Sequence, residues 1–130
     1  MNPVIHFEMG ANDTARMKTF YQTAFGWQMQ QMGEEMGNYV LVSTTETDDN
    51  GMVKTPGTIN GGFYQKTEDP TSHAPSVVIN VPNLDESMKK VVAAGGKILR
   101  DPDDIPGVGK WVSFMDTEGN RVSMMQSLRQ

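Results

Sequence analysis

Two side chains capable of acid–base chemistry stand near the start of the chain, His6 and Glu8, separated by one residue. Residues 4–9 alternate between a mixed face and an apolar face, as in a half-buried strand. The imidazole and the carboxylate therefore share a face. A carboxylate beside an imidazole tunes the imidazole pKa toward neutral pH, which suits proton transfer. The alternative is that the pair only binds a polar ligand or that the two satisfy one another, and either use places both in a site.

The residues after this strand predict a helix and three further strands. Asn12 or Asp13 caps a helix over about 13–25, and Gly26 stands where a helix C-terminus favours glycine. Three further strands follow from alternation and from the turn residues between them, at 27–32, 38–45 and 58–66. The first half therefore reads β-α-β-β-β.

The second half repeats this order. When His6 is placed on Ser76, Asp13 falls on Asn83 and Gly26 falls on Gly96. The expected elements are a strand over 76–81, a helix over 84–94 capped by Asn83, and strands at 97–100, 110–115 and 121–127. The segment 101–109 is rich in turn residues, and its Gly/Pro-containing end is either a turn or a lid beside a cleft.

Each half is too small to bury a good core alone. We therefore predict one pseudo-symmetric domain over 1–130, with module one at 1–66, a linker at 67–75, module two at 76–130, and a groove shared by the two modules. The linker is predicted from its prolines and small polar residues.

The composition of the chain argues against some classes of binding partner. The chain has 130 residues, a formal charge of −5 and no cysteine. Its basic residues form no cluster, which argues against nucleic acid and anionic membranes as partners. No apolar run approaches a membrane span, the N-terminus lacks the pattern of a secretory signal, and the absence of cysteine fits a reducing compartment. We expect a cytoplasmic protein.

Several motifs, taken together, cover nearly the whole chain. They are His6-Phe7-Glu8, Phe25-Gly26-Trp27, Gly61-Gly62-Phe63, Val81-Pro82-Asn83-Leu84-Asp85-Glu86, Ala94-Gly95-Gly96-Lys97, Ile105-Pro106-Gly107-Val108-Gly109 and Asp116-Thr117-Glu118-Gly119-Asn120. In order and spacing they resemble the vicinal oxygen chelate superfamily of glyoxalase I, bleomycin-resistance proteins and extradiol dioxygenases, and especially its small members related to lactoylglutathione lyase. The resemblance implies an α+β fold in which two tandem βαβββ modules form curved sheets around a central cleft.

Metal-dependent members of this superfamily hold a divalent ion with side chains from the first and last strand of each module. The resemblance maps these positions onto His6, Ser76, the neighbourhood of Gly62, and Ser123, where a glutamate is expected. Only His6 is a good ligand. We therefore predict no metal and no cofactor. The alternative is a divalent ion (zinc, nickel, manganese or iron) at a non-standard site that uses Glu8 or His73.

The predicted ligand-binding residues face the expected cleft. They are His6, Glu8, Tyr64, Asn80, Trp111, Arg121 and Ser123. Strand register decides this set, because a slip of one residue exchanges the inward and outward side chains. His6 and Glu8 are also the candidate catalytic pair.

Three functions remain open. The favoured one is a metal-independent protein that binds a small aromatic or polar molecule in the cleft. The alternative is a lactoylglutathione lyase-like or dioxygenase-like enzyme, which acts on a carbonyl compound or a vicinal diol by proton transfer through His6 and Glu8 or with a metal at a non-standard site. The third is a subunit whose groove serves oligomerisation only. The resemblance also makes a homodimer plausible.

Overall fold

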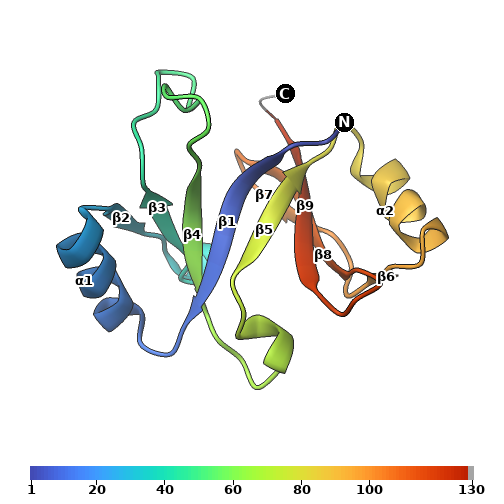
Figure 1. The fold of residues 1–130 in the computed structure, drawn as a ribbon, viewed down its shortest axis with the longest axis horizontal. Helices are drawn as coiled ribbons and strands as arrows, with labels where there is room; N and C mark the ends of the chain where they lie inside the picture. Colours follow the sequence, from blue (N-terminus) through green and yellow to red (C-terminus); the bar gives the residue numbers. More distant parts are fainter. Residues whose placement is uncertain (129–130) are drawn as a thin grey trace. The chain divides into compact units, whose positions relative to one another are not determined.

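A computed structural model describes residues 1–128, and Figure 1 shows its helices and strands. The chain divides into two compact units. One unit is His6–Pro75, here called the first unit; the other, the second unit, joins Met1–Ile5 to the chain from Ser76 onward. The N-terminal residues belong with the second unit because the backbone N–H of Asn80 donates to the carbonyl of Pro3 at 2.8 Å.

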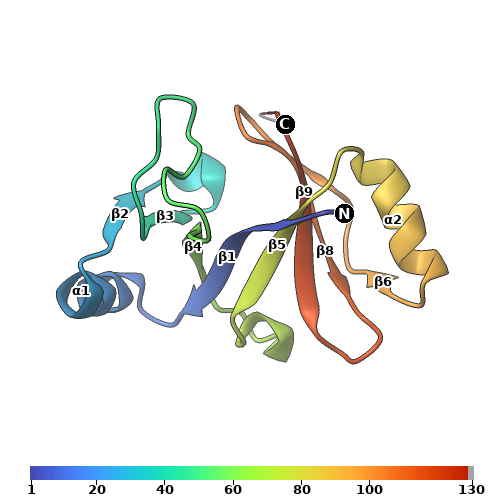
Figure 2. The ribbon, with the colours of Figure 1, turned by 45° about the horizontal axis from the view of Figure 1, so that its top comes forward.

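The first unit contains one α-helix and four strands in the predicted order. They are β1 (Val4–Ala11, of which His6–Ala11 lies in this unit), α1 (Thr14–Phe25), β2 (Gln28–Gln31), β3 (Val40–Ser43) and β4 (Asn60–Gln65). The spatial order is β2-β3-β4-β1, and β1 runs parallel to β4 while the other pairs are antiparallel. In Figures 1 and 2 α1 lies beside β2.

Helix α1 begins and ends where the sequence predicts. The Asp13 side chain accepts a hydrogen bond from the backbone N–H of Arg16 at 3.0 Å, which satisfies a donor that the first turn leaves open. Gly26 ends the helix in the left-handed region with φ 72°, a conformation that costs glycine little.

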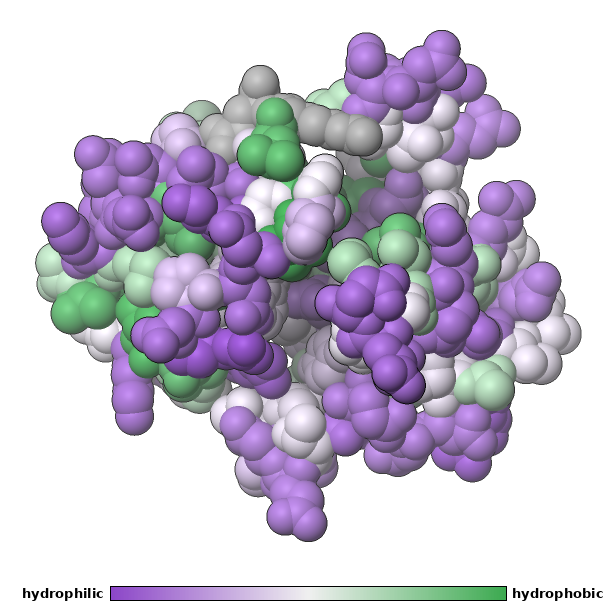
Figure 3. Space-filling view, turned by 180° about the vertical axis from the view of Figure 1, so that it is seen from behind, coloured by the Kyte–Doolittle hydropathy of each residue, from purple (hydrophilic) through white to green (hydrophobic). Residues whose placement is uncertain are grey.

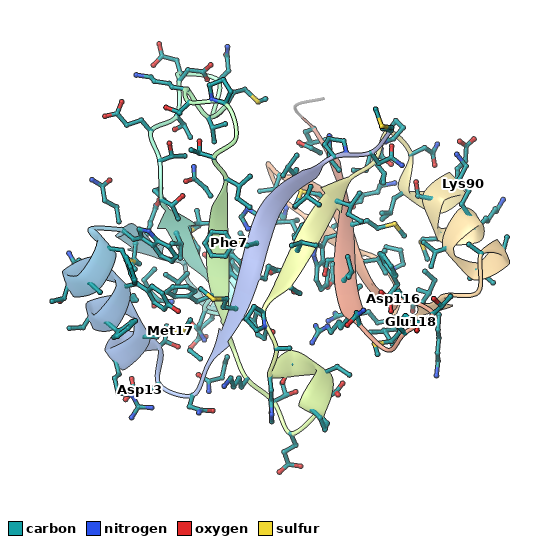
Figure 4. All side chains as sticks on the ribbon, viewed as in Figure 1. Phe7, Asp13, Met17, Lys90, Asp116 and Glu118 are labelled. Carbon is teal, nitrogen blue, oxygen red and sulfur yellow. The ribbon has the colours of Figure 1, made fainter. Side chains whose placement is uncertain are left out.

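The core of the first unit lies between α1 and the sheet. Val40, Val42 and Phe63 are almost fully buried there. Partly buried apolar side chains surround them, namely Phe7, Met9, Met17, Tyr21, Trp27 and Met29. Tyr21 stacks on Trp27 with ring centroids 4.7 Å apart. Figure 4 labels Phe7 of β1 and Met17 of α1, which both pack against this core. The apolar face predicted for residues 4–9 therefore packs against the helix.

The second unit has the same plan with one strand more. Its elements are β5 (Ser76–Asn80), α2 (Leu84–Ala93), β6 (Lys97–Ile98), β7 (Asp103–Ile105), β8 (Gly109–Met115) and β9 (Arg121–Ser127). The spatial order is β5-β9-β8-β6, with β7 paired to β8. Its buried core joins Leu84 of α2 to Val81, Val112, Phe114 and Met124.

The structure differs from the sequence prediction at two segments. The turn-rich segment 101–109 contains β7, which pairs with β8. Asp103 lies opposite Trp111, and Ile105 lies opposite Gly109. The segment 67–75 contains a short 3-10 helix at Pro70–Ser72 and packs into the first unit, where Ser72 is buried. The two βαβββ-type modules themselves are as predicted, while a single domain over the whole chain stays a prediction.

The surface seen in Figure 3 is mainly hydrophilic, and its hydrophobic residues form separate small patches. Among residues 1–128, no helix has the length and apolar character needed to cross a membrane.

Candidate ligand-binding site

Strand pairing places His6 and Glu8 on the face of the first sheet that is turned away from α1. Glu8 lies opposite Gly62 of β4, and Gly62 lies opposite Leu41 of β3. Side chains alternate along a strand, so the neighbours of Glu8 in β1, Phe7 and Met9, point to the helix. Glu8 is buried with 8% of its surface exposed, and His6 is partly exposed.

A third residue, Tyr39, joins the pair. Its hydroxyl donates a hydrogen bond to Oε2 of Glu8 at 3.0 Å, and it lies 3.2 Å from Nε2 of His6. The phenol occupies the space above Gly62, because a Cβ built on Gly62 would overlap the ring and hydroxyl of Tyr39. The hydroxyl therefore stands where a side chain at position 62 would begin.

The chain before β3 has an unusual backbone that leads into Tyr39. A 3-10 helix at Glu34–Met36 ends at Gly37 with φ 65°, and Asn38 follows with φ 57°. Asn38 is the one non-glycine residue in the left-handed region within the described part of the chain. Such a conformation is uncommon for a residue with a side chain, although asparagine tolerates it best. The carbonyl of Tyr39 then accepts from the N–H of Met32 at 2.9 Å, which ties the segment to the end of β2.

Burial dominates the electrostatics of the three groups. It lowers the pKa of His6 from 6.5 to about 4, so the imidazole is neutral at pH 7. Burial also raises the pKa of Tyr39 above its usual value, and the negative charge of Glu8 raises it further. The sequence-based expectation that Glu8 tunes the His6 pKa toward neutrality does not fit this arrangement: Tyr39 stands between the two groups, and burial disfavours the imidazolium.

Tyr64 lies on the same face of the first sheet, two residues after Gly62 on β4 and opposite Gly10 of β1. Its ring covers Gly10, where an added Cβ would lie 3.0 Å from Cε2 of Tyr64. Its hydroxyl donates to the carbonyl of Ser72 at 2.7 Å. The structure thus places His6, Glu8 and Tyr64 on one face, as predicted, while their role in binding stays a prediction.

In the second unit the other four predicted residues also share a face. Val78 lies opposite Ser123, Ser123 opposite Ser113, and Met125 lies opposite both Asn80 and Trp111. Arg121 is two residues before Ser123 on β9 and points to the same side. The opposite side of these strands carries Val112, Phe114 and Met124, which pack against α2. The register expected for 110–115 is therefore observed, and Asn80, Trp111, Arg121 and Ser123 lie on the face away from the helix.

The surroundings of Asn80 and Trp111 differ in kind. The Oδ1 atom of Asn80 is buried and makes no hydrogen bond within residues 1–128. The guanidinium carbon of Arg100 lies 5.8 Å from the centroid of the Trp111 ring, and Arg100 also pairs with Asp103 at 2.8 Å. A buried acceptor without a donor costs free energy, so its presence calls for an explanation.

The register also tests the metal positions that the resemblance implies. Glu8 pairs with Gly62 in the first unit just as its repeat partner Val78 pairs with Ser123 in the second, so Gly62 and Ser123 are equivalent positions. Neither carries a carboxylate or an imidazole. Within residues 1–128 there is no group of three or more His, Asp or Glu side chains that could hold an ion. The Nε2 of His73 lies 2.9 Å from the carbonyl of Thr67. These donors do not fit a catalytic divalent ion.

Sequence reasoning missed Tyr39, although the repeat contained a signal for it. Leu41 lies opposite Gly62, and Ser113 lies opposite Ser123, so Leu41 and Ser113 occupy equivalent places. Tyr39 therefore corresponds to Trp111, which was among the predicted site residues. Extending the repeat to β3 and β8 identifies an aromatic residue at this place in both modules.

A cavity of about 480 Å³ lies elsewhere in the first unit. Its lining is polar and includes Gln28, Ser43, Thr45 and Lys54. None of the predicted site residues lines it.

Comparison with known proteins establishes the family. Residues 4–124 match the model of the Glyoxalase/Bleomycin resistance protein/Dioxygenase superfamily, and the chain belongs to this superfamily. No curated protein matches the chain by sequence.

Solved structures with the same fold are distant in sequence. A methylmalonyl-CoA epimerase in complex with methylmalonyl-CoA and NH4+ has a TM-score of 0.69 at 15% identity, with 98% of this chain and 96% of that chain covered. A variant of the Streptomyces coelicolor methylmalonyl-CoA epimerase in complex with 2-nitronate-propionyl-CoA has a TM-score of 0.68 at 14% identity, with 96% of each chain covered. The Mycobacterium tuberculosis methylmalonyl-CoA epimerase has a TM-score of 0.63 at 11% identity, with 95% of this chain and 87% of that chain covered. At these identities the likeness concerns the fold alone.

Proposed function

We propose that this chain is a small-molecule-binding protein that works without a metal ion, and that the face of the first sheet carrying His6, Tyr39 and Glu8 takes part in binding the ligand. The observation that carries the proposal is the position of Tyr39. Its phenol fills the hollow above Gly62 and engages both His6 and Glu8. The one imidazole at the family's metal positions is thus held by a phenol, and the equivalent positions Ser76, Gly62 and Ser123 offer no comparable donor.

The neutral imidazole supports binding over proton transfer. A general base works best when its pKa lies near the working pH. With a pKa of about 4, His6 is a weak base at neutral pH, but it is a good hydrogen-bonding group.

Metal titration followed by ligand screening tests the proposal. Nickel, zinc and manganese are added separately to the chelator-treated protein, and the melting temperature is followed. We expect no rise at low micromolar metal. A rise that is lost in His6→Ala and kept in His73→Ala would overturn the metal-independent proposal, because a ligand that binds only the folded state stabilises it by mass action. Screening of small aromatic and polar compounds in the presence of chelator should then give compounds that raise the melting temperature of the wild type and not of His6→Ala.

An enzyme on the same scaffold is the second candidate. The hydrogen-bonded series from His6 through Tyr39 to Glu8 favours it, since such a series can relay a proton. The substrates to test are the methylglyoxal–glutathione hemithioacetal, catechols and, from the printed ligands of the similar structures, methylmalonyl-CoA. Turnover that disappears in His6→Ala would establish this candidate in place of pure binding.

A further inference from the structure

We infer that the ligand of the His6 face donates a hydrogen bond, from a hydroxyl or an N–H group, to Nδ1 of His6. This inference rests on the proposed function and specifies the kind of ligand that the site selects.

The direction of the hydrogen bonds supports it. The Tyr39 hydroxyl is the donor in its hydrogen bond to Oε2 of Glu8, and a phenol has a single proton to donate. Since the Tyr39 hydroxyl donates that proton to Glu8, its oxygen can only accept from Nε2 of His6. The Nε2 atom therefore carries the proton of the neutral imidazole, and Nδ1 is left as a bare acceptor.

The Nδ1 atom is available to a ligand. The structure gives it no hydrogen-bond partner among residues 1–128, and the His6 side chain is only partly buried. Tyr39 cannot turn its proton toward His6 without giving up the bond to Glu8, and the hollow above Gly62 holds the ring in place. The Tyr39–Glu8 hydrogen bond thus fixes the proton of His6 on Nε2, and this leaves Nδ1 as an acceptor that prefers a ligand donor.

The second unit, taken by itself, offers the same kind of group. The Oδ1 atom of Asn80 is buried without a donor on the face away from α2. A ligand N–H or O–H is the partner that such an acceptor lacks. Each unit, considered separately, thus presents an acceptor to a hydrogen-bond donor.

Matched pairs of compounds test the inference with the wild-type protein. The library pairs phenols with anisoles, benzamides with N,N-dimethylbenzamides, and alcohols with methyl ethers. Binding is followed by the 15N signals of the histidine side chains and by the dissociation constant. We expect the donor member of a binding pair to bind at least about tenfold more tightly than its methylated partner, because the methylated partner leaves Nδ1 unsatisfied. We also expect the donor member to move the Nδ1 signal of His6.

Two variants sharpen the test. Tyr39→Phe removes the oxygen that accepts from Nε2, so the preference for donors should fall to within about threefold. Tyr21→Phe is the control, since it also removes one phenol hydroxyl, but from the helix-facing side, where within residues 1–128 its one hydrogen bond goes to the sulfur of Met9 at 3.9 Å. Amide spectra of both variants report whether they remain folded.

The outcomes separate the inference from the proposed function. Equal affinity within the pairs, while the His6 signals move, overturns the inference and leaves the proposed function standing. An Nδ1-protonated imidazole in the free wild type also overturns the inference. If no compound binds and the His6 signals do not move, the proposed function fails and the inference fails with it.

Discussion

Acid should destabilise the protein through His6 in a defined pH window. Burial lowers the pKa of this imidazole from 6.5 to about 4 in the folded state. Between these two values the unfolded chain binds a proton at His6 that the folded chain does not bind. The free energy of unfolding therefore falls as the pH is lowered through this window, and it stops responding to His6 below about pH 4.

The size of the effect follows from the two pKa values. One pKa unit corresponds to about 1.4 kcal/mol, so the full difference between 6.5 and about 4 is about 3 to 4 kcal/mol. Between pH 7 and about pH 4.5 the loss is about 2 kcal/mol. Carboxylates also titrate toward the lower end of this range, so the contribution of His6 must be isolated by substitution.

Urea unfolding at pH 7 and at about pH 4.5 measures the contribution of His6 to the unfolding free energy. His6→Asn keeps a polar side chain but cannot titrate, and the difference in unfolding free energy between the two pH values should shrink by about 2 kcal/mol. His73→Asn is the matched control, because these are the two histidines of the chain. If the wild type and His6→Asn respond identically to pH, the burial of a neutral imidazole is refuted as the cause.

Three further experiments test the packing around Tyr39 and Gly62 in the first unit and around Asn80 in the second unit. Tyr39→Phe removes hydrogen bonds to Glu8 and His6 and should lower the unfolding free energy by about 2 kcal/mol in chemical denaturation, whereas Tyr21→Phe should change it by less than about 0.5 kcal/mol. Gly62→Ala should lower the unfolding free energy by more than about 2 kcal/mol in the wild type but by less than about 0.5 kcal/mol in a Tyr39→Ala background. Additive effects in this double-mutant cycle would contradict the overlap of Tyr39 with position 62. Asn80→Leu should leave the melting temperature of the ligand-free protein unchanged or raised, since its buried Oδ1 makes no hydrogen bond, and a clear decrease would show that this atom is satisfied after all.

Local signals in the sequence were sufficient for most elements. The alternation at 4–9, the cap Asp13 and the glycine Gly26 correctly predicted β1 and both ends of α1. The second module followed because the repeat carries the same signals, with Asn83 as the cap of α2. Each of these features depends on a period or a cap within a few residues, so one sequence reveals it.

Features that depend on distant pairing were harder to predict. Strand β7 has only three residues and is held by its pairing with β8. The residues of 101–109 have the composition of a turn, so the segment by itself gives no sign of a strand. The segment 67–75 also has the composition of a linker, yet the Ser72 hydroxyl donates to the carbonyl of Asp69 at 2.7 Å and Tyr64 bonds its backbone. These contacts with the chain before it make the segment part of the first unit.

Tyr39 and Gly62 illustrate why the site could be predicted only in part. The family resemblance led us to expect a metal-ligand position near Gly62, where this sequence has no ligand, but the sequence did not reveal which side chain occupies the space above that glycine. The glycine leaves a hollow, the phenol fills it, and the backbone at Gly37 and Asn38 leads the chain to it. These features form one arrangement, because a longer residue at 62 would expel Tyr39 and break its bonds to His6 and Glu8. Introducing a carboxylate at position 62 alone would therefore disrupt the packing of Tyr39 on the first sheet, and only a simultaneous change at Tyr39 would make room for the new side chain.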